Sequence, residues 1–300
     1  AKYDITTVAL VTFPDVVAKD SIFSGFLVGD ASGAAITADT VMGWAARSAA
    51  AADDNAYTDL TVYVNLQAVN RDVTSEDTGL SVASGVLSVS DGTKFAAWLN
   101  SLNGAFVIPK TVDGADVTSL KLGAFAGQTA IKSLYIFDFN ASGALILDSI
   151  TFKGGADKRT FNNCTALTTL VVYSDTVTSL GIGTFCMDNT GLTDATVILG
   201  AKQTAGSTWF KDCKTLKEAY IDLGNAETDF RNAYENLFSG AKALEKVTFR
   251  MASDVLGSNL FYGCSALTTA EISLPGFTGT NSSGKGANMF SGCAKLTTVT

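Results

Sequence analysis

The sequence predicts an α/β solenoid, in which short repeats each add one strand to a parallel β-sheet, preceded by a small α+β domain. The first observation behind this prediction is a Phe–Cys–Leu pattern that recurs along the later part of the chain. The second is the alternation of apolar and polar residues after each Leu of the pattern. The third is that residues 1–78 lack the pattern. A chain of 300 residues, 47% of them hydrophobic, is long enough to bury a core in both parts.

The first 78 residues are predicted to form the α+β domain. Apolar runs at 8–13 and 22–28 predict strands, and the alternation over 60–69 predicts another. The Ala-rich segment 40–52 predicts a helix. Capping of the solenoid, oligomerisation and attachment are three roles that fit such a domain, and no pattern in it singles out one of them.

The solenoid is predicted over residues 79–300, with residues 79–108 as its N-terminal cap. Within this cap, 80–90 predicts a hairpin that turns at Gly85, and 93–102 predicts a short helix. A cap is needed because the first repeat would otherwise leave its apolar side in water.

The clearest repeat begins at Phe161 and reads Phe-Asn-Asn-Cys-Thr-Ala-Leu-Thr-Thr-Leu-Val-Val. Side chains alternate along a strand, so Leu170 and Val172 are expected to face inward and Tyr173 outward. One repeat cannot bury its own Phe and Leu, whereas stacking on a neighbour stabilises each large side chain by roughly 1.5–3 kcal/mol. Further copies, at intervals of 23 to 36 residues, start at Phe125, Phe185, Phe210, Phe238, Phe261 and Phe290.

Over about residues 80–300 the chain resembles the BspA-like leucine-rich repeats. The resemblance rests on Phe-Val-Ile-Pro-Lys-Thr-Val-Asp-Gly at 106–114 and on the Phe-x-Gly-Cys-x-x-Leu-Thr-Thr unit at Phe261. It implies a surface-exposed leucine-rich-repeat solenoid used for adhesion or protein recognition, with no catalytic residue to carry over. Two copies depart from the pattern, with Gln128 and Ala241 in the Cys position, and the uneven spacing suggests insertions, most clearly within 135–160.

The composition argues against an enzyme. The chain contains no histidine, which removes Ser–His and Cys–His nucleophile pairs and nearly every catalytic zinc arrangement. Residues 279–286 resemble a phosphate-cradling loop, but Gly286 stands where the magnesium-binding hydroxyl residue belongs. We therefore expect no catalytic residues, no cofactor and no metal site.

The charge pattern narrows the class of partner. The net charge is −8 and no Lys/Arg cluster interrupts it, so binding to nucleic acid has no electrostatic basis. The apolar stretches fall short of the roughly 18 residues of a membrane helix, so membrane insertion is not expected. The first residues show no signal-peptide pattern, which leaves open whether a signal has been removed.

The five cysteines follow the repeat. None forms a close pair such as C-x-x-C, which disfavours a metal site. We expect buried, reduced thiols that pack as small apolar side chains. Disulfides between neighbouring repeats are the alternative. Cys186 lies one residue after its Phe, and the others lie three residues after theirs: Cys164, Cys213, Cys264 and Cys293.

The outward side of the sheet is the predicted partner-binding face. Its earlier members are aromatic or apolar and its later members are charged, and exposed aromatic rows often mark contact surfaces. The alternative is that the N-terminal domain or an insertion covers Tyr135, Phe137 and Tyr173. The candidate residues are Tyr135, Phe137, Val171, Tyr173, Ile198, Tyr220, Asp222 and Arg250.

These features predict a non-catalytic recognition or adhesion module, extracellular or at the cell surface, whose ligand is a protein or glycan on another surface. The alternative is a structural subunit of an extracellular assembly, such as a virion decoration or fibre protein or a filament subunit, whose partners are copies of itself or other subunits. That alternative draws on the final repeat, which reaches Thr300 without a polar cap, and on a composition with only 17% charged residues.

Overall fold

In the computed structural model the chain divides into two compact units, residues 1–69 and 70–300. The first unit contains an antiparallel pair of strands, β1 (Ser21–Val28) and β2 (Val62–Ala68). These match the strands predicted at 22–28 and 60–69, while the strand predicted at 8–13 and the helix at 40–52 lie outside the described residues. The structure describes residues 21–28, 62–121, 123–137, 160–174, 190–200, 209–223, 236–251, 258–274 and 286–300.

The second unit begins at Asn70, ahead of the predicted boundary at residue 78. The reason is that the intervening residues already pair with the solenoid: β3 (Asp72–Val73) runs parallel to β7 (Thr111–Val112). The helix α2 (Ser75–Thr78) follows β3 and ends at Gly79. Gly79 has a φ of 67°, and a Cβ there would lie 2.3 Å from a backbone oxygen, so glycine is required.

The N-terminal cap has the predicted hairpin and helix. Strands β4 (Leu80–Ala83) and β5 (Val86–Val89) pair antiparallel around a turn at Ser84 and Gly85, both with positive φ. The helix α3 (Gly92–Ser101) starts at Asp91, whose carboxylate accepts hydrogen bonds from the backbone N–H groups of Thr93 and Lys94, at 2.9 and 3.0 Å. Short strands β8 (Ala115–Asp116) and β9 (Ser119–Leu120) complete two small sheets, β3-β7-β8 and β4-β5-β9.

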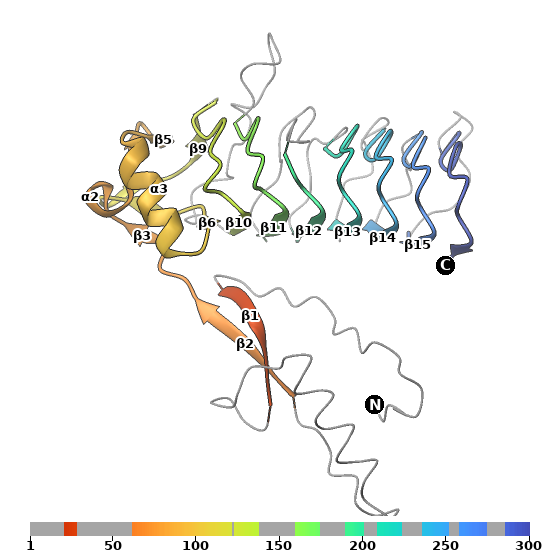
Figure 1. Ribbon diagram of the computed structural model, residues 1–300, viewed down its shortest axis with the longest axis horizontal. Coiled ribbons are helices and arrows are strands. Elements are labelled where there is room, and N and C mark those ends of the chain that lie inside the picture. Colours follow the sequence, from red (N-terminus) through yellow and green to blue (C-terminus); the bar gives the residue numbers. More distant parts are fainter. Residues whose placement is uncertain are drawn as a thin grey trace, which may run out of the picture. The chain divides into compact units, whose positions relative to one another are not determined.

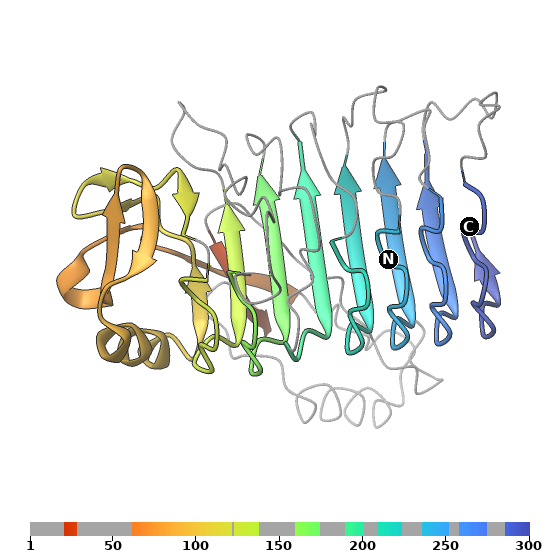
Figure 2. The same ribbon diagram turned by 90° about the horizontal axis from the view of Figure 1, so that it is seen from above.

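The main sheet has eight strands, and each is parallel to the next (Figure 2). Successive strands along the chain are neighbours in the sheet, as stacked repeats require. This arrangement confirms the predicted solenoid. The strands are β6 (Ala105–Val107), β10 (Ser133–Phe137), β11 (Thr169–Ser174), β12 (Asp194–Leu199), β13 (Glu218–Leu223), β14 (Lys246–Met251), β15 (Thr269–Ser273) and β16 (Thr298–Val299).

The Phe side chains form part of the interior of the solenoid. Phe238 stacks on Phe210 and on Phe261, with ring centroids 5.4 Å apart in both pairs. Phe161 stacks in the same way on Phe125. At the cap, Phe95 of α3 packs edge-on against Phe106 at 5.2 Å, which closes this end of the aromatic column. The repeated Phe residues that the structure describes therefore share one environment, as the sequence pattern predicts, while Phe185 lies outside the described residues.

The segment that carries each Phe and Cys is a tight turn. In the repeat at Phe161, the N–H of Cys164 donates to the oxygen of Phe161 at 3.3 Å, and the N–H of Leu167 donates to the oxygen of Cys164 at 3.0 Å. Asn163 between them has a φ of 59°, which stops the turn from continuing as a helix. The predicted short helical turns are thus single hydrogen-bonded turns.

A second ladder of backbone hydrogen bonds joins the turns of neighbouring repeats, opposite the sheet (Figure 1). The N–H of Phe238 donates to the oxygen of Leu260 at 2.9 Å, and the N–H of Gly240 donates to the oxygen of Tyr262 at 2.8 Å. The stack is therefore held by backbone pairing on two sides and by apolar packing between them. In the described part of the chain, no helix is long and apolar enough to cross a membrane.

Candidate interaction face of the sheet

The register of the strands sorts the outward side chains of β10 to β15 into three rows, which we call the outward face. Directly opposed residues belong to the same row, and neighbouring strands lie about 4.8 Å apart, so side chains within a row are neighbours. The first row is Ser133, Thr169, Asp194, Glu218, Lys246 and Thr269. The middle row is Tyr135, Val171, Thr196, Tyr220, Thr248 and Glu271. The last row is Phe137, Tyr173, Ile198, Asp222, Arg250 and Ser273.

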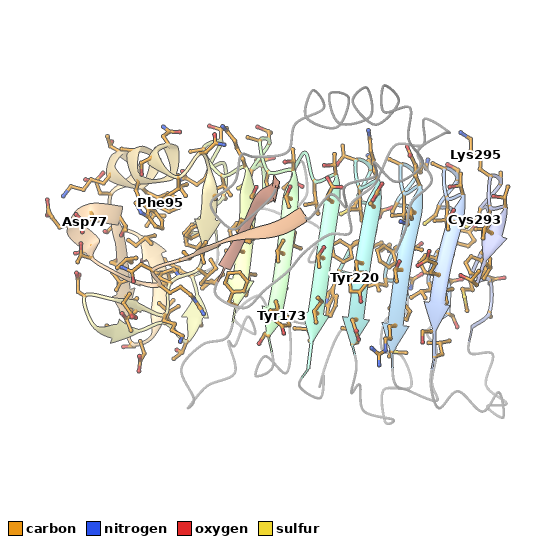
Figure 3. All side chains as sticks on the ribbon, turned by 90° about the horizontal axis from the view of Figure 1, so that it is seen from below. Asp77, Phe95, Tyr173, Tyr220, Cys293 and Lys295 are labelled. Atoms are coloured by element: carbon orange, nitrogen blue, oxygen red, sulfur yellow. The ribbon has the colours of Figure 1, made fainter. Side chains whose placement is uncertain are left out.

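Four of the predicted residues make up what we call the apolar patch of the outward face: Val171 and Tyr173 on β11, Ile198 on β12 and Tyr220 on β13. Figure 3 labels Tyr173 and Tyr220 on this side of the sheet. Tyr220 is 38% exposed, whereas Val171, Tyr173 and Ile198 are half-buried, and Tyr173 is directly opposed to Ile198. The residues between them on each strand point into the core, as the fully buried Val172 shows. The alternation read from the sequence therefore assigns these side chains to the correct side.

Phe137 is an exception, because its side chain is fully buried. The guanidinium of Arg71 lies over its ring, with the central carbon 5.8 Å from the ring centroid. Arg71 also donates hydrogen bonds to the backbone oxygens of Ile108, at 3.2 Å, and Phe137, at 3.4 Å. Phe137 lies in its predicted row but is not available to a partner, so its assignment to the accessible face is corrected.

Tyr135 is intermediate in exposure between the buried Phe137 and the exposed Tyr220. Its ring centroid is 6.2 Å from that of Phe137, and the side chain is half-buried. Burial raises the pKa of the Tyr135 hydroxyl above its ordinary value, despite a hydrogen bond with Ser133 that acts in the opposite direction. Tyr135 therefore stays neutral at physiological pH and serves as packing surface.

The later strands carry the polar part of the outward face. The guanidinium of Arg250 lies 3.3 Å from the carboxylate of Asp222 on the neighbouring strand. The hydroxyl of Thr248 donates to the carboxylate of Glu271 at 3.1 Å. Because Arg250 is more than half exposed, this ion pair contributes only about 0–1 kcal/mol to stability, and it orders the two side chains.

Two acidic residues of the first row were not among the predicted candidates. Asp194 and Glu218 are directly opposed on β12 and β13, and both are exposed. Neither has an ion pair within 4.0 Å among the described residues, although Lys246 is the next member of the row. Each is the first residue of its strand and precedes the apolar alternation. The prediction of outward residues, which used that alternation, therefore did not include them.

Three of the described cysteines are free thiols that contact the preceding repeat. The thiols of Cys164 and Cys264 are buried and donate to the backbone oxygens of Phe125 and Phe238 in the preceding repeats, at 3.0 and 3.1 Å. Burial raises the pKa of Cys164 to about 11 and that of Cys264 to about 12. Cys293 makes the same contact with Phe261 at 3.1 Å, from a half-buried position.

The prediction of a row of reduced thiols holds for these three residues but is wrong for Cys213, which is disulfide-bonded. Its position in the repeat is the same as theirs, so the Phe–Cys–Leu pattern alone does not reveal the difference. Cys186 lies outside the described residues. Among the described residues, no group of three or more Cys, Asp or Glu is placed to hold a metal ion.

Comparison with known proteins identifies the repeat. Three overlapping stretches, 108–217, 147–268 and 203–300, match the family model described as BspA type leucine rich repeat region (6 copies). The chain is similar to a crystal structure of a leucine-rich repeat protein of T. pallidum, with 16% identity over 75% of this chain and 79% of that chain and a TM-score of 0.35. It is also similar to a leucine-rich repeat protein from Bacteroides ovatus, with 17% identity over 73% and 74% of the two chains and a TM-score of 0.23. A comparison with curated proteins finds no match.

Proposed function

The chain belongs to the BspA-type leucine-rich-repeat family, and from this premise we propose that it is a non-catalytic recognition or adhesion module that binds through the outward face of its sheet. Proteins built from such repeats are interaction modules in general. The observation that carries the proposal is the apolar patch of Val171, Tyr173, Ile198 and Tyr220, which lies beside the polar residues of the later strands. Tyrosine is well suited to such a surface, because it buries a large area and has a hydroxyl for hydrogen bonding.

Rigidity supports the same function. The side chains of the outward face stand on strands that are paired on both sides from β10 to β15, so backbone pairing sets their spacing before a partner binds. A partner then loses less free energy to ordering than it would on a set of loops. The proposed location is the cell surface or the extracellular space. The family resemblance implies it, and the disulfide of Cys213 fits it, since disulfides persist in oxidising compartments.

The test compares two tyrosines on different sides of one solenoid. Purified protein is applied to arrays of extracellular proteins and glycans, with Tyr220→Asp as the face variant. Tyr262→Asp is the matched control, because Tyr262 is 49% exposed but lies in a turn opposite the sheet. We expect Tyr220→Asp to weaken binding to any ligand found by tenfold or more, as for an aromatic residue at the centre of an interface. Tyr262→Asp should leave the affinity unchanged.

Equal effects of the two substitutions, or none from Tyr220→Asp together with Tyr173→Asp, would refute binding through this face. Circular dichroism and the melting temperature of each variant show that the fold is intact. Light scattering of the wild-type protein adds a second readout. Self-association that Tyr220→Asp abolishes would favour the structural-subunit alternative, in which copies of the chain bury the same patch.

A further inference from the structure

We propose that the partner of the outward face is a basic polypeptide segment, in which Lys or Arg side chains alternate with apolar ones. This inference rests on the proposed function and specifies the chemistry of the ligand. It is carried by three features of the face: the apolar patch, two opposed carboxylates that have no ion pair among the described residues, and the guanidinium of Arg71 over Phe137 in the last row.

The carboxylates set the sign of the charge. Asp194 and Glu218 are directly opposed on adjacent strands, where like charges repel each other. Neither is neutralised by an ion pair among the described residues. Across the three rows the acidic side chains are Asp194, Glu218, Asp222 and Glu271, and the basic ones are Lys246 and Arg250. Four negative and two positive charges leave this face at −2, within a chain of net charge −8.

The carboxylates border the apolar patch. Glu218 lies two residues before Tyr220 on β13, whereas Asp194 lies four residues before Ile198 on β12, with Thr196 between them. Residues two apart on one strand point to the same side, so a partner segment lying across the strands meets acidic and apolar positions together. A ligand that fills the patch and carries a cation relieves the repulsion between Asp194 and Glu218. A neutral or acidic ligand of the same shape leaves that repulsion in place or adds to it.

Arg71 shows that this face accepts a cation on its aromatic side. Its guanidinium lies over Phe137, and Phe137 is directly opposed to Tyr173 in the last row. The ring of Tyr173 thus neighbours a position where a guanidinium is already bound. Aromatic faces attract cations, and Arg more often than Lys. Tyr173 and Tyr220 provide such faces to an incoming partner, and Tyr220 lies on β13 two residues after the carboxylate of Glu218.

The experiment selects binders from a random peptide library displayed on phage, with the intact 300-residue protein as bait. Affinities of the enriched peptides are then measured by calorimetry against charge variants. Asp194→Asn/Glu218→Gln removes two negative charges from the face, and Glu76→Gln/Asp77→Asn removes two exposed ones from α2. Lys246→Glu adds negative charge beside Glu218.

We expect enriched peptides with a net positive charge and apolar residues. Asp194→Asn/Glu218→Gln should weaken their binding about fivefold or more, and raising NaCl from about 50 to about 300 mM should do the same. The α2 variant should bind like the wild type. Lys246→Glu should strengthen binding, a gain that partial unfolding cannot produce.

Two kinds of result would overturn the inference alone. One is that the selected peptides, or the glycans found on the arrays, are neutral or acidic while Tyr220→Asp still abolishes their binding. The other is that basic peptides bind equally well to the wild type and to Asp194→Asn/Glu218→Gln. If no peptide is enriched, the inference also falls. If binders are found but no substitution on the outward face affects them, the proposed function fails as well.

Discussion

Cys164 and Cys264 illustrate how single residues link one repeat to the next. Each thiol donates to the oxygen of the Phe in the preceding repeat, so the side chain both fills space and ties two units together. Ala241 stands in the same position of its repeat and is equally buried, without a donor. The position thus tolerates a small apolar residue, and the S–H bond adds to a contact that packing already provides.

The raised pKa values of these thiols lead to a testable difference in reactivity. At pH 8, iodoacetamide should modify Cys293 first and Cys164 and Cys264 far more slowly, because the thiolate is the reactive form and burial suppresses it. Mass spectrometry of peptides over a time course measures the order. In denaturant without reductant all three should react quickly, while Cys213 should stay protected by its disulfide. Rapid native labelling of Cys264 would contradict this assignment.

The same thiols affect stability at alkaline pH. In the unfolded chain they ionise near their ordinary pKa of 9.0, whereas the folded chain holds the protons of Cys164 and Cys264 until about 11 and about 12. Above pH 9 the unfolded state therefore binds fewer protons, and stability falls as pH rises. We expect denaturant melts from pH 8 to pH 10.5 to show a smaller loss for Cys164→Ala/Cys264→Ala than for the wild type. An equal loss would show that other groups control the alkaline limit.

Leu167 tests the register of the core. Its side chain is fully buried in the turn that follows Phe161. Leu167→Asp should destabilise the protein by more than about 4 kcal/mol, because it removes apolar packing and buries a charge without a partner. Thr168→Asp, one residue along and exposed, is the control and should change stability by less than about 1 kcal/mol. Chemical denaturation measures both, and an unchanged midpoint for Leu167→Asp would contradict the assignment of the inward side.

Individual contacts that cross between distant segments escaped prediction. The burial of Phe137 depends on Arg71, which is 66 residues away, and neither residue belongs to a pattern that relates them. The disulfide of Cys213 is hidden for a similar reason, because its repeat reads like those with free thiols. Periodicity assigns the side of the sheet on which a residue lies, but it does not reveal what covers that side.

At the level of elements, the strands were predictable because their alternation is strict. Inward residues of β11 such as Leu170 and Val172 are fully buried, and the outward ones between them are not. The turns were less clear, because their defining feature is backbone conformation. Two left-handed residues flank Phe261, Asn259 with a φ of 56° and Gly263 with a φ of 73°. The frequent Asn and Gly around each Phe are the sequence signal for this geometry.

Gly263 offers a test of that geometry. A Cβ at Gly263 would meet nothing closer than 3.9 Å, so a substitution is opposed by backbone strain and not by a clash. Gly263→Ala should cost about 1 kcal/mol, while Gly263→Asn should cost less, because Asn tolerates the left-handed region. Asn163 and Asp212 occupy the equivalent position in their own repeats. Urea titrations compare the variants, and equal costs for Ala and Asn would indicate that space is limiting after all.

Across the whole solenoid, stability is a property of interfaces between neighbouring repeats. Within the main sheet each strand from β10 to β15 pairs only with the strands on either side of it, and the rings from Phe210 to Phe290 stack one on the next. A repeat therefore influences distant repeats only through the repeats that lie between them. The same architecture builds the outward face, because a constant register places one residue from every repeat in each row. A substitution in the interior of the solenoid should consequently destabilise the adjacent repeats before it affects distant ones.

Phe238→Ala should reveal this local coupling. Phe238 contacts both Phe210 and Phe261, so its loss weakens two interfaces and should cost about 3–5 kcal/mol. Hydrogen exchange measured by mass spectrometry should show the greatest loss of protection in β13 and β14 and the least in β10 and β11. Tyr262→Ala, which removes an exposed ring from the neighbouring turn, is the control and should leave the pattern intact. A uniform loss of protection in every strand would mean that the solenoid unfolds as one unit, and the interfaces could not then be treated as separate contributions.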